Sequence, residues 1–340
     1  MKEKLLTITV PAYNAERYLE HCLSSIESVA DEPKLLDVLE VLIVNDGSSD
    51  STELIGKKFE KKRPGIFHVI SKENGGHGSG INTGIANAHG RYFKVVDADD
   101  WLNTSELKDY LRMLGGRNED VVASDFFCVD DDETTILSRK KVDPTERLYG
   151  RTVELSKEYL SHVIKMHSMT IRTELLHKMN RQIDEHMYYV DQEYITYPVP
   201  YIESVFYDRR YLYMYRLGRN GQSMERTVLC RNRLMHRRVI ESLVSYYDYI
   251  VKECKLDLSD TKLKYFQRCI GDMIDNQFQI YISIGIEEGM KKELREWDDE
   301  IRQSHPELYS ATSKKSINLL RYTDYRLLGV AYVAYRLIKG

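Results

Sequence analysis

The sequence of 340 residues has few cysteines, little net charge and no long hydrophobic run. Its five cysteines lack the paired spacing of zinc sites, which predicts reduced thiols in the cytoplasm. The net charge of −4, from 49 basic and 53 acidic residues, excludes the overall basic excess of a nucleic-acid-binding protein. The longest apolar run, Leu327 to Tyr335, is nine residues and too short to cross a bilayer. Strand residues within ten positions of Met1 predict that no signal peptide is present.

Strand patterns alternate with helical patterns through residue 126. The predicted strands run from Leu5 to Val10, Val38 to Val44, Ile66 to Ile70 and Tyr92 to Val96. The first helix is predicted from apolar or small residues at Leu19, Cys22, Leu23 and Ile26, with Asn14 as its N-cap. This order predicts an α/β fold with a mostly parallel sheet and right-handed crossovers.

The segment Gly90 to Trp101 ends a buried strand in three carboxylates, Asp97, Asp99 and Asp100. Open α/β sheets bind ligands at the carboxyl ends of their strands. Alternate residues share a face, so Asp97 and Asp99 can turn toward one ligand. Mg²⁺ and Mn²⁺ prefer such oxygen ligands, which predicts a metal that bridges two phosphates. The alternative is an acidic N-terminus for a helix that begins near Thr104.

Four motifs, VPAYN, VNDGSSDST, ENGGHGSGINTG and DADD, follow one another along the chain. In this order and spacing they resemble the family 2 glycosyltransferases, whose catalytic domain has the GT-A fold. The resemblance is strong over about the first 115 residues and extends more weakly to about residue 225. It implies a GT-A catalytic domain at 1–225, with a nucleotide-sugar-binding half at 1–115 and an acceptor half at 116–225. A helical C-terminal region follows at 226–340.

The resemblance implies roles for the residues of these motifs. Asp99 would ligate Mn²⁺ or Mg²⁺ on the diphosphate of a nucleotide sugar, with a UDP-sugar favoured. Asp97 would approach the ribose, Asp46 would lie against the base, and Asp100 would cap or support. Glu16 would lie near the nucleoside, or serve as a carboxylate in the first turn of a helix. The donor pocket would further include Pro11, Ala12, Tyr13, Asn14, Lys72, Asn74, Gly75, Gly76, His77, Asn82 and Ala98.

The glycine-rich segment lets backbone approach a ligand closely, but it does not fit a dinucleotide fingerprint, because no glycine stands three positions after Gly78. Many relatives carry an arginine where this chain has Ile81. A cation that would touch the diphosphate is therefore missing, and Lys72 or His77 is the candidate to replace it. The alternative for His77 is an ordinary surface histidine.

A sugar transferase that inverts the anomeric centre needs a carboxylate to accept the acceptor's proton. The candidate is Asp191 in MYYVDQEYITYPV, where Val190 replaces the first acid of the family's pair. Glu193 is a competitor, and a helix cap is the alternative role for Asp191. The preceding stretch HSMTIRTELL, residues 167–176, resembles the part of the family that reaches the acceptor site. Farther along the chain, phosphate contacts or a solvated surface are the alternatives for Arg216, Arg219 and Gln222.

Helical patterns fill the rest of the chain, at 228–254, 260–286 and 287–303. On a continuous helix over 314–339, six basic residues fall within one 140° arc, opposite an apolar face. This predicts either a helix on an anionic membrane surface or a terminal helix packed on the domain. The six residues are Lys314, Lys315, Arg321, Arg326, Arg336 and Lys339.

The sequence therefore predicts an inverting, metal-dependent glycosyltransferase that extends a bacterial surface glycan or a lipid-linked precursor. Its expected location is the cytoplasm, on the inner face of the membrane if the tail binds lipid. The alternatives are a nucleotidyltransferase and a non-catalytic nucleotide-sugar-binding module. Release of a free nucleoside diphosphate rather than pyrophosphate separates the first two. The sugar, the acceptor and the oligomeric state stay open.

Overall fold

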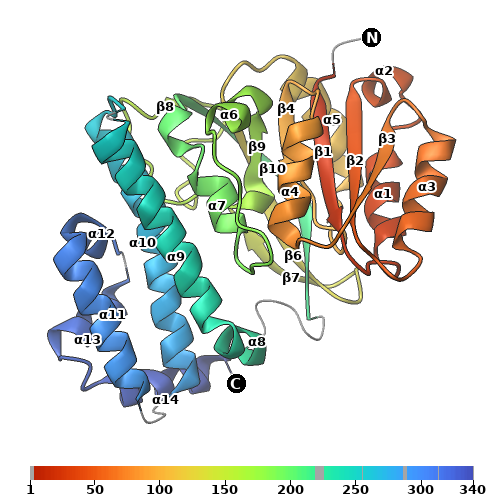
Figure 1. Ribbon diagram of the computed structural model, residues 1–340. Helices are drawn as coiled ribbons and strands as arrows, with labels where there is room; N and C mark the ends of the chain where they lie inside the picture. Colours follow the sequence, from red (N-terminus) through yellow and green to blue (C-terminus); the bar gives the residue numbers. More distant parts are fainter. Residues whose placement is uncertain (1–3, 219–225, 255, 286–288, 313, 340) are drawn as a thin grey trace. The chain divides into compact units, whose positions relative to one another are not determined.

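The computed structural model describes residues 4–218, 226–254, 256–285, 289–312 and 314–339 (Figure 1). The chain divides into two compact units. The first comprises Met1–Glu158 and Ile164–Arg219, and the second comprises Tyr159–Val163 and Asn220–Gly340.

A ten-stranded sheet forms the first unit, with the order β3-β2-β1-β4-β9-β6-β10-β5, while β7 pairs with β6 and β8 pairs with β10. The strands are β1 (Leu6–Ala12), β2 (Leu39–Asp46), β3 (Phe67–Lys72), β4 (Tyr92–Val95), β5 (Trp101–Leu102), β6 (Val121–Asp130), β7 (Ile136–Lys140), β8 (Thr152–Glu154), β9 (Met169–Arg172) and β10 (Ser204–Leu217).

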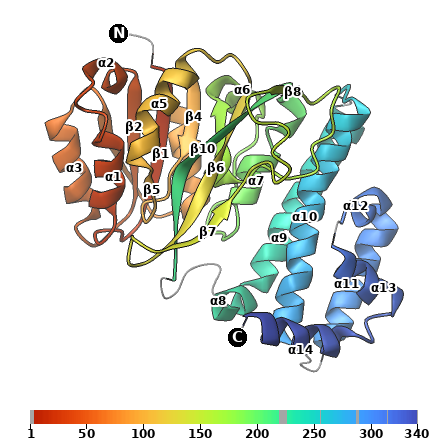
Figure 2. The same ribbon diagram turned by 180° about the vertical axis from the view of Figure 1, so that it is seen from behind.

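Helices lie on both faces of this sheet: α4 covers one face in Figure 1, and α5 is seen on the other in Figure 2. The helices are α1 (Leu19–Glu27), α2 (Pro33–Leu36), α3 (Thr52–Lys62), α4 (His77–Asn87), α5 (Thr104–Gly115), α6 (Thr173–Lys178) and α7 (Asp191–Thr196), with 3₁₀ turns η1 (Met166–Ser168) and η2 (Val199–Tyr201).

The four strands β3, β2, β1 and β4 pair in parallel, as the alternating pattern predicts. Beyond β4 the pairing is mixed, because β9 runs antiparallel to both β4 and β6, and β5 runs antiparallel to β10. Strand β5 lies beside β10 rather than beside β4, and of the described strands in this half only β6 and β10 pair in parallel. The predicted parallel arrangement therefore describes the first half of the sheet and not the second.

The central strands β1 and β2 are buried along their whole length, as expected for strands covered on both faces. Helix α4 packs very close to β1 because Gly84 has no side chain. A Cβ atom at Gly84 would lie 2.1 Å from Oγ1 of Thr9. This close packing fixes the N-terminus of α4 at the carboxyl end of β1.

Helix α1 buries the predicted residues Leu19, Cys22, Leu23 and Ile26, but the prediction of Asn14 as its N-cap is wrong. The helix begins after Tyr18, without a side-chain cap. Asn14 instead adopts a positive φ of 47°, a conformation that asparagine tolerates better than most residues. Helix α5 begins at Thr104, as predicted.

Helices make up the second unit, in agreement with the helical patterns of the sequence. They are α8 (Arg226–Arg231), α9 (Arg233–Asp248) with a π-helical end η3 (Tyr249–Glu253), α10 (Asp260–Ile284), α11 (Met290–Ser304), α12 (Pro306–Ser310), α13 (Lys315–Tyr322) and α14 (Leu328–Lys339). Among the described helices, none combines the length and the apolar character needed to span a membrane.

The predicted continuous helix over 314–339 is wrong. A turn separates α13 from α14, and Asp324 and Tyr325 have positive φ angles of 50° and 59° there. Arg321 points inward, where its guanidinium lies 2.7 Å from Oδ1 of buried Asp298. The hydroxyl of Tyr325 donates a hydrogen bond to the same carboxylate. Because the turn changes the helical phase and Arg321 is buried, the six basic residues do not form one exposed face.

Candidate active site at the carboxyl ends of the parallel strands

The four motifs of the sequence lie at one edge of the sheet. Strands β1, β2, β3 and β4 are parallel, and a motif follows the carboxyl end of each. Pro11 and Ala12 are the buried last residues of β1, whereas Tyr13, the next residue, is 56% exposed. An exposed ring beside the end of a central strand is available to stack on a flat ligand.

Asn14 and Glu16 tie the first loop to the second. Oδ1 of Asn14 accepts a hydrogen bond from the backbone N–H of Ser49 (2.9 Å). Oε2 of Glu16 accepts one from the N–H of Ser51 (3.0 Å). Both predicted donor-binding residues thus hold the loops that would surround a nucleoside.

Asp46 organises the glycine segment. Its buried carboxylate accepts hydrogen bonds from the N–H of Gly75 (2.9 Å) and of Gly76 (2.7 Å), and Lys72 Nζ donates to it at 3.0 Å. The amide of Asn74 donates to the Asp46 carbonyl. Lys72, a candidate for the missing diphosphate cation, is therefore paired with a protein carboxylate.

His77 opens helix α4 and faces the DADD turn. Its Nε2 lies 2.8 Å from Oδ1 of Asp97, and about a third of its side chain is exposed. Burial opposes charge on the ring, but the nearby carboxylates of Asp97, Asp191 and Asp99 raise the pKa of His77 above its usual value. The predicted base and the DADD carboxylates therefore lie close enough to act electrostatically on one imidazole.

Asp100 supports the DADD turn, as the resemblance implies. The hydroxyl of Tyr213 donates a hydrogen bond to Oδ2 of Asp100 (2.6 Å), and the backbone N–H of Arg216 donates one to Oδ1 (2.7 Å). Burial, then the charges of Asp99 and Asp97, raise the pKa of Asp100. A cation at these carboxylates would relieve their mutual repulsion. Asp97 and Asp99 are half-buried, and Ala98 between them is buried.

Arg216 is buried, so both alternatives for it, phosphate contacts and a solvated surface, are wrong. It is only 1% exposed, and its Nε donates to the backbone carbonyl of Asp99 (2.7 Å). The guanidinium carbon lies 4.8 Å from the ring centroid of Tyr18 and 4.9 Å from that of Trp101. Arg216 thus positions the backbone of the proposed metal ligand. Arg219 and Gln222 lie outside the described residues.

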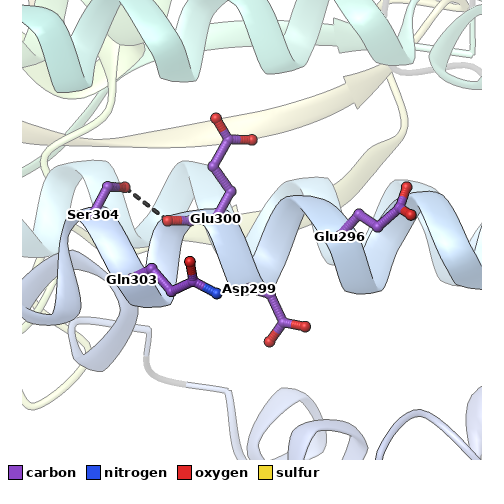
Figure 3. Close-up of a pocket in the computed structure, with 5 residues that line it drawn as sticks. All are labelled: Glu296, Asp299, Glu300, Gln303 and Ser304. Atoms are coloured by element: carbon purple, nitrogen blue, oxygen red, sulfur yellow. Dashed lines mark hydrogen bonds between the residues drawn. The ribbon is translucent and has the colours of Figure 1, made fainter.

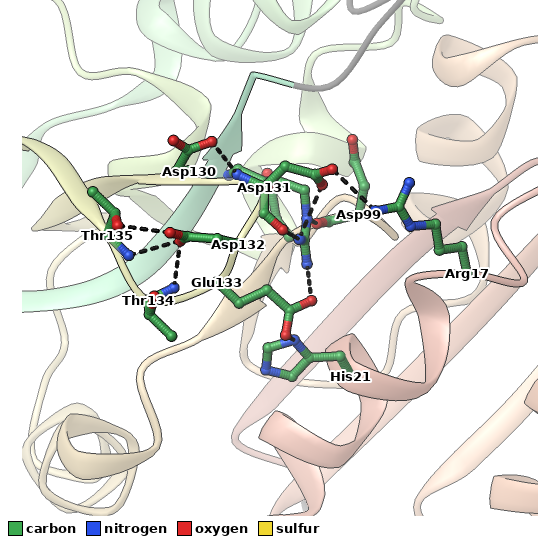
Figure 4. Close-up of polar contacts among 11 residues, drawn as sticks. Arg17, His21, Asp99, Asp130, Asp131, Asp132, Glu133, Thr134 and Thr135 are labelled. Carbon is green, nitrogen blue, oxygen red and sulfur yellow. Dashed lines mark hydrogen bonds and ion pairs between the residues drawn. The ribbon is translucent and has the colours of Figure 1, made fainter.

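The turn between β6 and β7 joins this arrangement (Figure 4). Asp131 forms an ion pair with exposed Arg17 (3.0 Å), and Glu133 forms one with Arg216 (2.7 Å). Nδ1 of His21 lies 3.0 Å from the other oxygen of Glu133. The acidic turn therefore binds cations of the first loop and of β10 rather than extending freely into solvent.

His167 lies at the DADD turn. In the sequence it opens the stretch that resembles the acceptor part of the family, but the sequence does not predict it as a metal ligand. One ligand atom each from Asp97, Asp100 and His167 lies within 4.8 Å of the others. The Nε2 of His167 is enclosed and has no hydrogen-bond partner among the described residues. Burial lowers the pKa of His167 to about 4, so its imidazole is neutral at physiological pH. A neutral imidazole beside carboxylates fits a divalent cation such as Mn²⁺.

Lys94 holds the segment that carries His167. Its buried ammonium donates to the carbonyl oxygens of His167 (2.8 Å) and Met169 (3.2 Å). Burial lowers the pKa of Lys94 to about 7. The position of His167 therefore depends on a residue of β4, the strand that leads into the DADD turn.

The two candidate bases differ in accessibility. Asp191 is the first residue of α7, is half-buried, and accepts a hydrogen bond from its neighbour Gln192 at 2.8 Å. Glu193 has no exposed surface, and its Oε2 accepts from the N–H of Asp184 (2.7 Å). Burial raises the pKa of Glu193 to about 7. Asp191 is consequently the carboxylate of the pair that a substrate can approach.

A segment that we call the strap, residues 183–190, connects the glycine segment to Asp191. Asn82 donates to the Ile183 carbonyl (2.8 Å) and accepts from the Ile183 N–H (2.9 Å), so its amide serves the strap. The N–H of His186 donates to the carbonyl of Gly75 at 2.6 Å. The donor-binding segment and the proposed base are thus linked through short backbone contacts.

We expect Gly78→Ala to destabilise the protein, because the added Cβ would lie 2.2 Å from the backbone oxygen of Asp184 in the strap. Overpacking of this kind lowers the free energy of unfolding by about 1–3 kcal/mol. Gly65→Ala is the matched control, since a Cβ there meets nothing within 4 Å. Chemical denaturation measures both variants. Equal stability of the two would show that the strap does not pack on α4 in this way.

The second unit has a shallow hollow along α11, lined by Glu296, Asp299, Glu300, Gln303 and Ser304 (Figure 3). Acidic side chains along one helix face are typical of a solvated surface. The hollow contains no residue of the four motifs.

The glycine segment and the paired carboxylates thus lie at the edge of the parallel strands where open α/β sheets bind their ligands. The sequence profile described as Glycosyl transferase family 2 matches residues 7–180. The chain belongs to this family. The minor teichoic acid biosynthesis protein GgaB of Bacillus subtilis is 32% identical over 123 residues, which is 36% of this chain and 13% of that protein. The match to this chain spans 18% and 34% of the length of two other curated relatives.

Solved structures share the fold, which confirms the predicted GT-A class. S. aureus TarS 1–349 in complex with UDP-GlcNAc matches with a TM-score of 0.69 and 19% identity, over 97% of this chain and 92% of that one. A mannosyltransferase from Pyrobaculum calidifontis in complex with GDP-Man and Mn²⁺ has a TM-score of 0.51 and 14% identity, over 98% of this chain and 86% of that one.

Proposed function

We propose that this protein is an inverting, metal-dependent glycosyltransferase that moves a sugar from a UDP-sugar to a glycan or lipid-linked acceptor of a bacterial surface polysaccharide. The UDP-GlcNAc bound to TarS and the name of GgaB support the donor and the acceptor class. The Mn²⁺ and GDP-Man in the mannosyltransferase complex support the metal. Catalysis would belong to residues 1–225, with the donor half at 1–115, the acceptor half at 116–225 and a helical region at 226–340.

The observation that carries the proposal concerns His77, which lies 2.8 Å from Asp97 of the DADD turn and also feels the charge of Asp191. Asp97, Asp99 and Asp191 all act on the pKa of His77, although more than ninety residues separate Asp191 from the turn. A donor held at the turn would therefore present its sugar to a carboxylate that can accept a proton. General-base catalysis of this kind contributes about 10²- to 10⁴-fold to a rate.

Each part of the site would have one task. The N-terminus of α4, and not the N–H groups of Gly75 and Gly76 before it, would bind the diphosphate, because those two groups already donate to Asp46. Asp99 would hold Mn²⁺ or Mg²⁺ together with ligands from the neighbouring group of Asp97, Asp100 and His167, and the ion would supply positive charge to the departing diphosphate when bound. His77 would supply the cation that an arginine in place of Ile81 supplies in many relatives, and Asp191 would take the acceptor proton.

A screen of nucleotide sugars for hydrolysis tests the proposal, because slow transfer to water requires no knowledge of the acceptor. We expect one UDP-sugar to release free UDP with Mn²⁺ present, and the release to stop when the metal is chelated. Production of pyrophosphate would favour a nucleotidyltransferase instead. Binding of a UDP-sugar without any turnover would favour a non-catalytic module.

A further inference from the structure

Helix α14 exposes an apolar face. Val330, Val333 and Leu337 are 64%, 54% and 81% exposed, and Ala334 is exposed beside them. Their spacing of three, four and seven residues places all four on one stripe of the helix. A helix on the surface of a soluble unit normally turns such a stripe inward, so this stripe requires a partner.

The orientation of α14 is fixed by its opposite face. Leu328 is 2% exposed, and the ring of Tyr332 lies against Gly285 at the end of α10. The preceding helix is anchored by Ile317 and Leu320, which are 0% and 2% exposed. The apolar stripe therefore faces outward because the other side of the helix is already packed.

Helix α13, the turn after it and the end of α14 also carry exposed apolar and basic side chains. Leu319 and Tyr322 are 52% and 89% exposed. Lys315, Arg326 and Arg336 are exposed as well. Residues 314–340 contain six basic side chains and one acidic side chain, a formal charge of +5 in a chain whose total is −4. The rest of the chain is thus acidic, and the segment that carries the apolar stripe is basic, with Lys315, Arg326 and Arg336 exposed and Arg321 paired with Asp298.

We propose that α13 and α14 form a membrane-contact surface that lies on an anionic lipid bilayer. The stripe of α14 would enter the boundary between headgroups and acyl chains, and the surrounding Lys and Arg side chains would bind lipid phosphates. The acidic remainder of the chain would be repelled by the same leaflet, so only this face would make contact. The proposal does not depend on the transfer reaction, because α13 and α14 carry no residue of the site.

Charge favours a bilayer over a second copy of the chain. In a two-fold symmetric dimer through α14, each stripe would meet the same stripe, and two equally basic segments would be brought together. Like charges placed opposite one another disfavour such a contact. An anionic leaflet would both bury the apolar stripe and attract the exposed cations.

Flotation of the full chain with lipid vesicles tests the proposal. We expect binding to vesicles of phosphatidylcholine with phosphatidylglycerol, none to phosphatidylcholine alone, and weaker binding as salt is raised. Val333→Glu combined with Leu337→Glu should weaken partition by about tenfold or more, since charges replace apolar side chains that enter the interface. Leu54→Glu on α3 is the matched control, because Leu54 is 59% exposed and lies in the other unit.

Two results would overturn the proposal. The first is a wild-type protein that ignores anionic vesicles at low salt. The second is a wild-type protein that does not bind vesicles but forms a dimer in light scattering, together with a double variant that is monomeric. That result would make the stripe a self-association surface. Circular dichroism checks that the double variant folds, and Leu337→Ser replaces it if it does not. Donor hydrolysis should be equal in wild type and variants, so failure here is distinguishable from failure of the proposed function.

Discussion

Replacement of Asp191 with asparagine should lower the rate of donor hydrolysis by about 10²-fold or more, because the variant keeps the shape of the side chain but cannot accept a proton. Donor affinity should stay nearly constant, since the base acts only in the chemical step. Hydrolysis of the UDP-sugar found by screening gives the rate, and calorimetry with UDP and Mn²⁺ gives the affinity. The two measurements separate the loss of a base from the loss of a binding residue.

Glu193→Gln is the informative comparison. Glu193 is enclosed and accepts a hydrogen bond from the backbone of the strap. Its replacement should therefore lower the free energy of unfolding, while the hydrolysis rate of the folded variant should change little. If Glu193→Gln loses hydrolysis at full stability while Asp191→Asn retains it, the two carboxylates must exchange roles. A smaller effect of Asp191→Asn, within a few-fold, would remove the residue from the mechanism.

The donor side of the site was open to prediction because its parts are local. Each motif directly follows a strand, and parallel strands bring their carboxyl ends to one edge. Pro11, Asp46, Gly75 and Asp97 therefore lie at that edge as the sequence predicts. What the local pattern did not reveal is which of these side chains serve the protein: Asp46 holds the glycine segment rather than facing open solvent.

The contributions of distant segments were not predictable in the same way. His167 reaches the DADD turn through antiparallel β9, and Arg216 reaches it along β10, across pairings that no sequence period encodes. Both residue types are common on surfaces, so neither type nor spacing marked them as buried. The same holds for the strap, whose contacts with Asn82 and the glycine segment join parts of the chain about one hundred residues apart.

The tail shows how one tertiary contact changes a pattern. A period of 100° per residue is valid only while one helix continues, and the turn at Asp324 and Tyr325 ends α13. Buried Asp298 on α11 pairs with Arg321 and takes it out of the predicted basic face. What remains is an exposed apolar stripe on a basic segment, which is a different reason to propose the same kind of partner.

Replacement of Asp99 with asparagine should remove most metal-dependent donor binding, because it deletes an anionic ligand while the size of the side chain is kept. Arg216 donates to the backbone carbonyl of Asp99, a contact that the substitution leaves in place, so the fold of the turn should survive the change. Calorimetry with UDP and Mn²⁺ measures the loss, and UDP without metal gives the baseline.

Asp109→Asn is the matched control for Asp99→Asn, since it removes the same charge from an exposed position on α5. Wild-type affinity in Asp109→Asn together with metal-independent, weak binding in Asp99→Asn would assign the metal to the DADD turn. Unchanged affinity in a folded Asp99→Asn variant would contradict that assignment. In that event Asp97 and His167, whose ligand atoms already lie near each other, become the residues to replace next, because a cation there would not need Asp99.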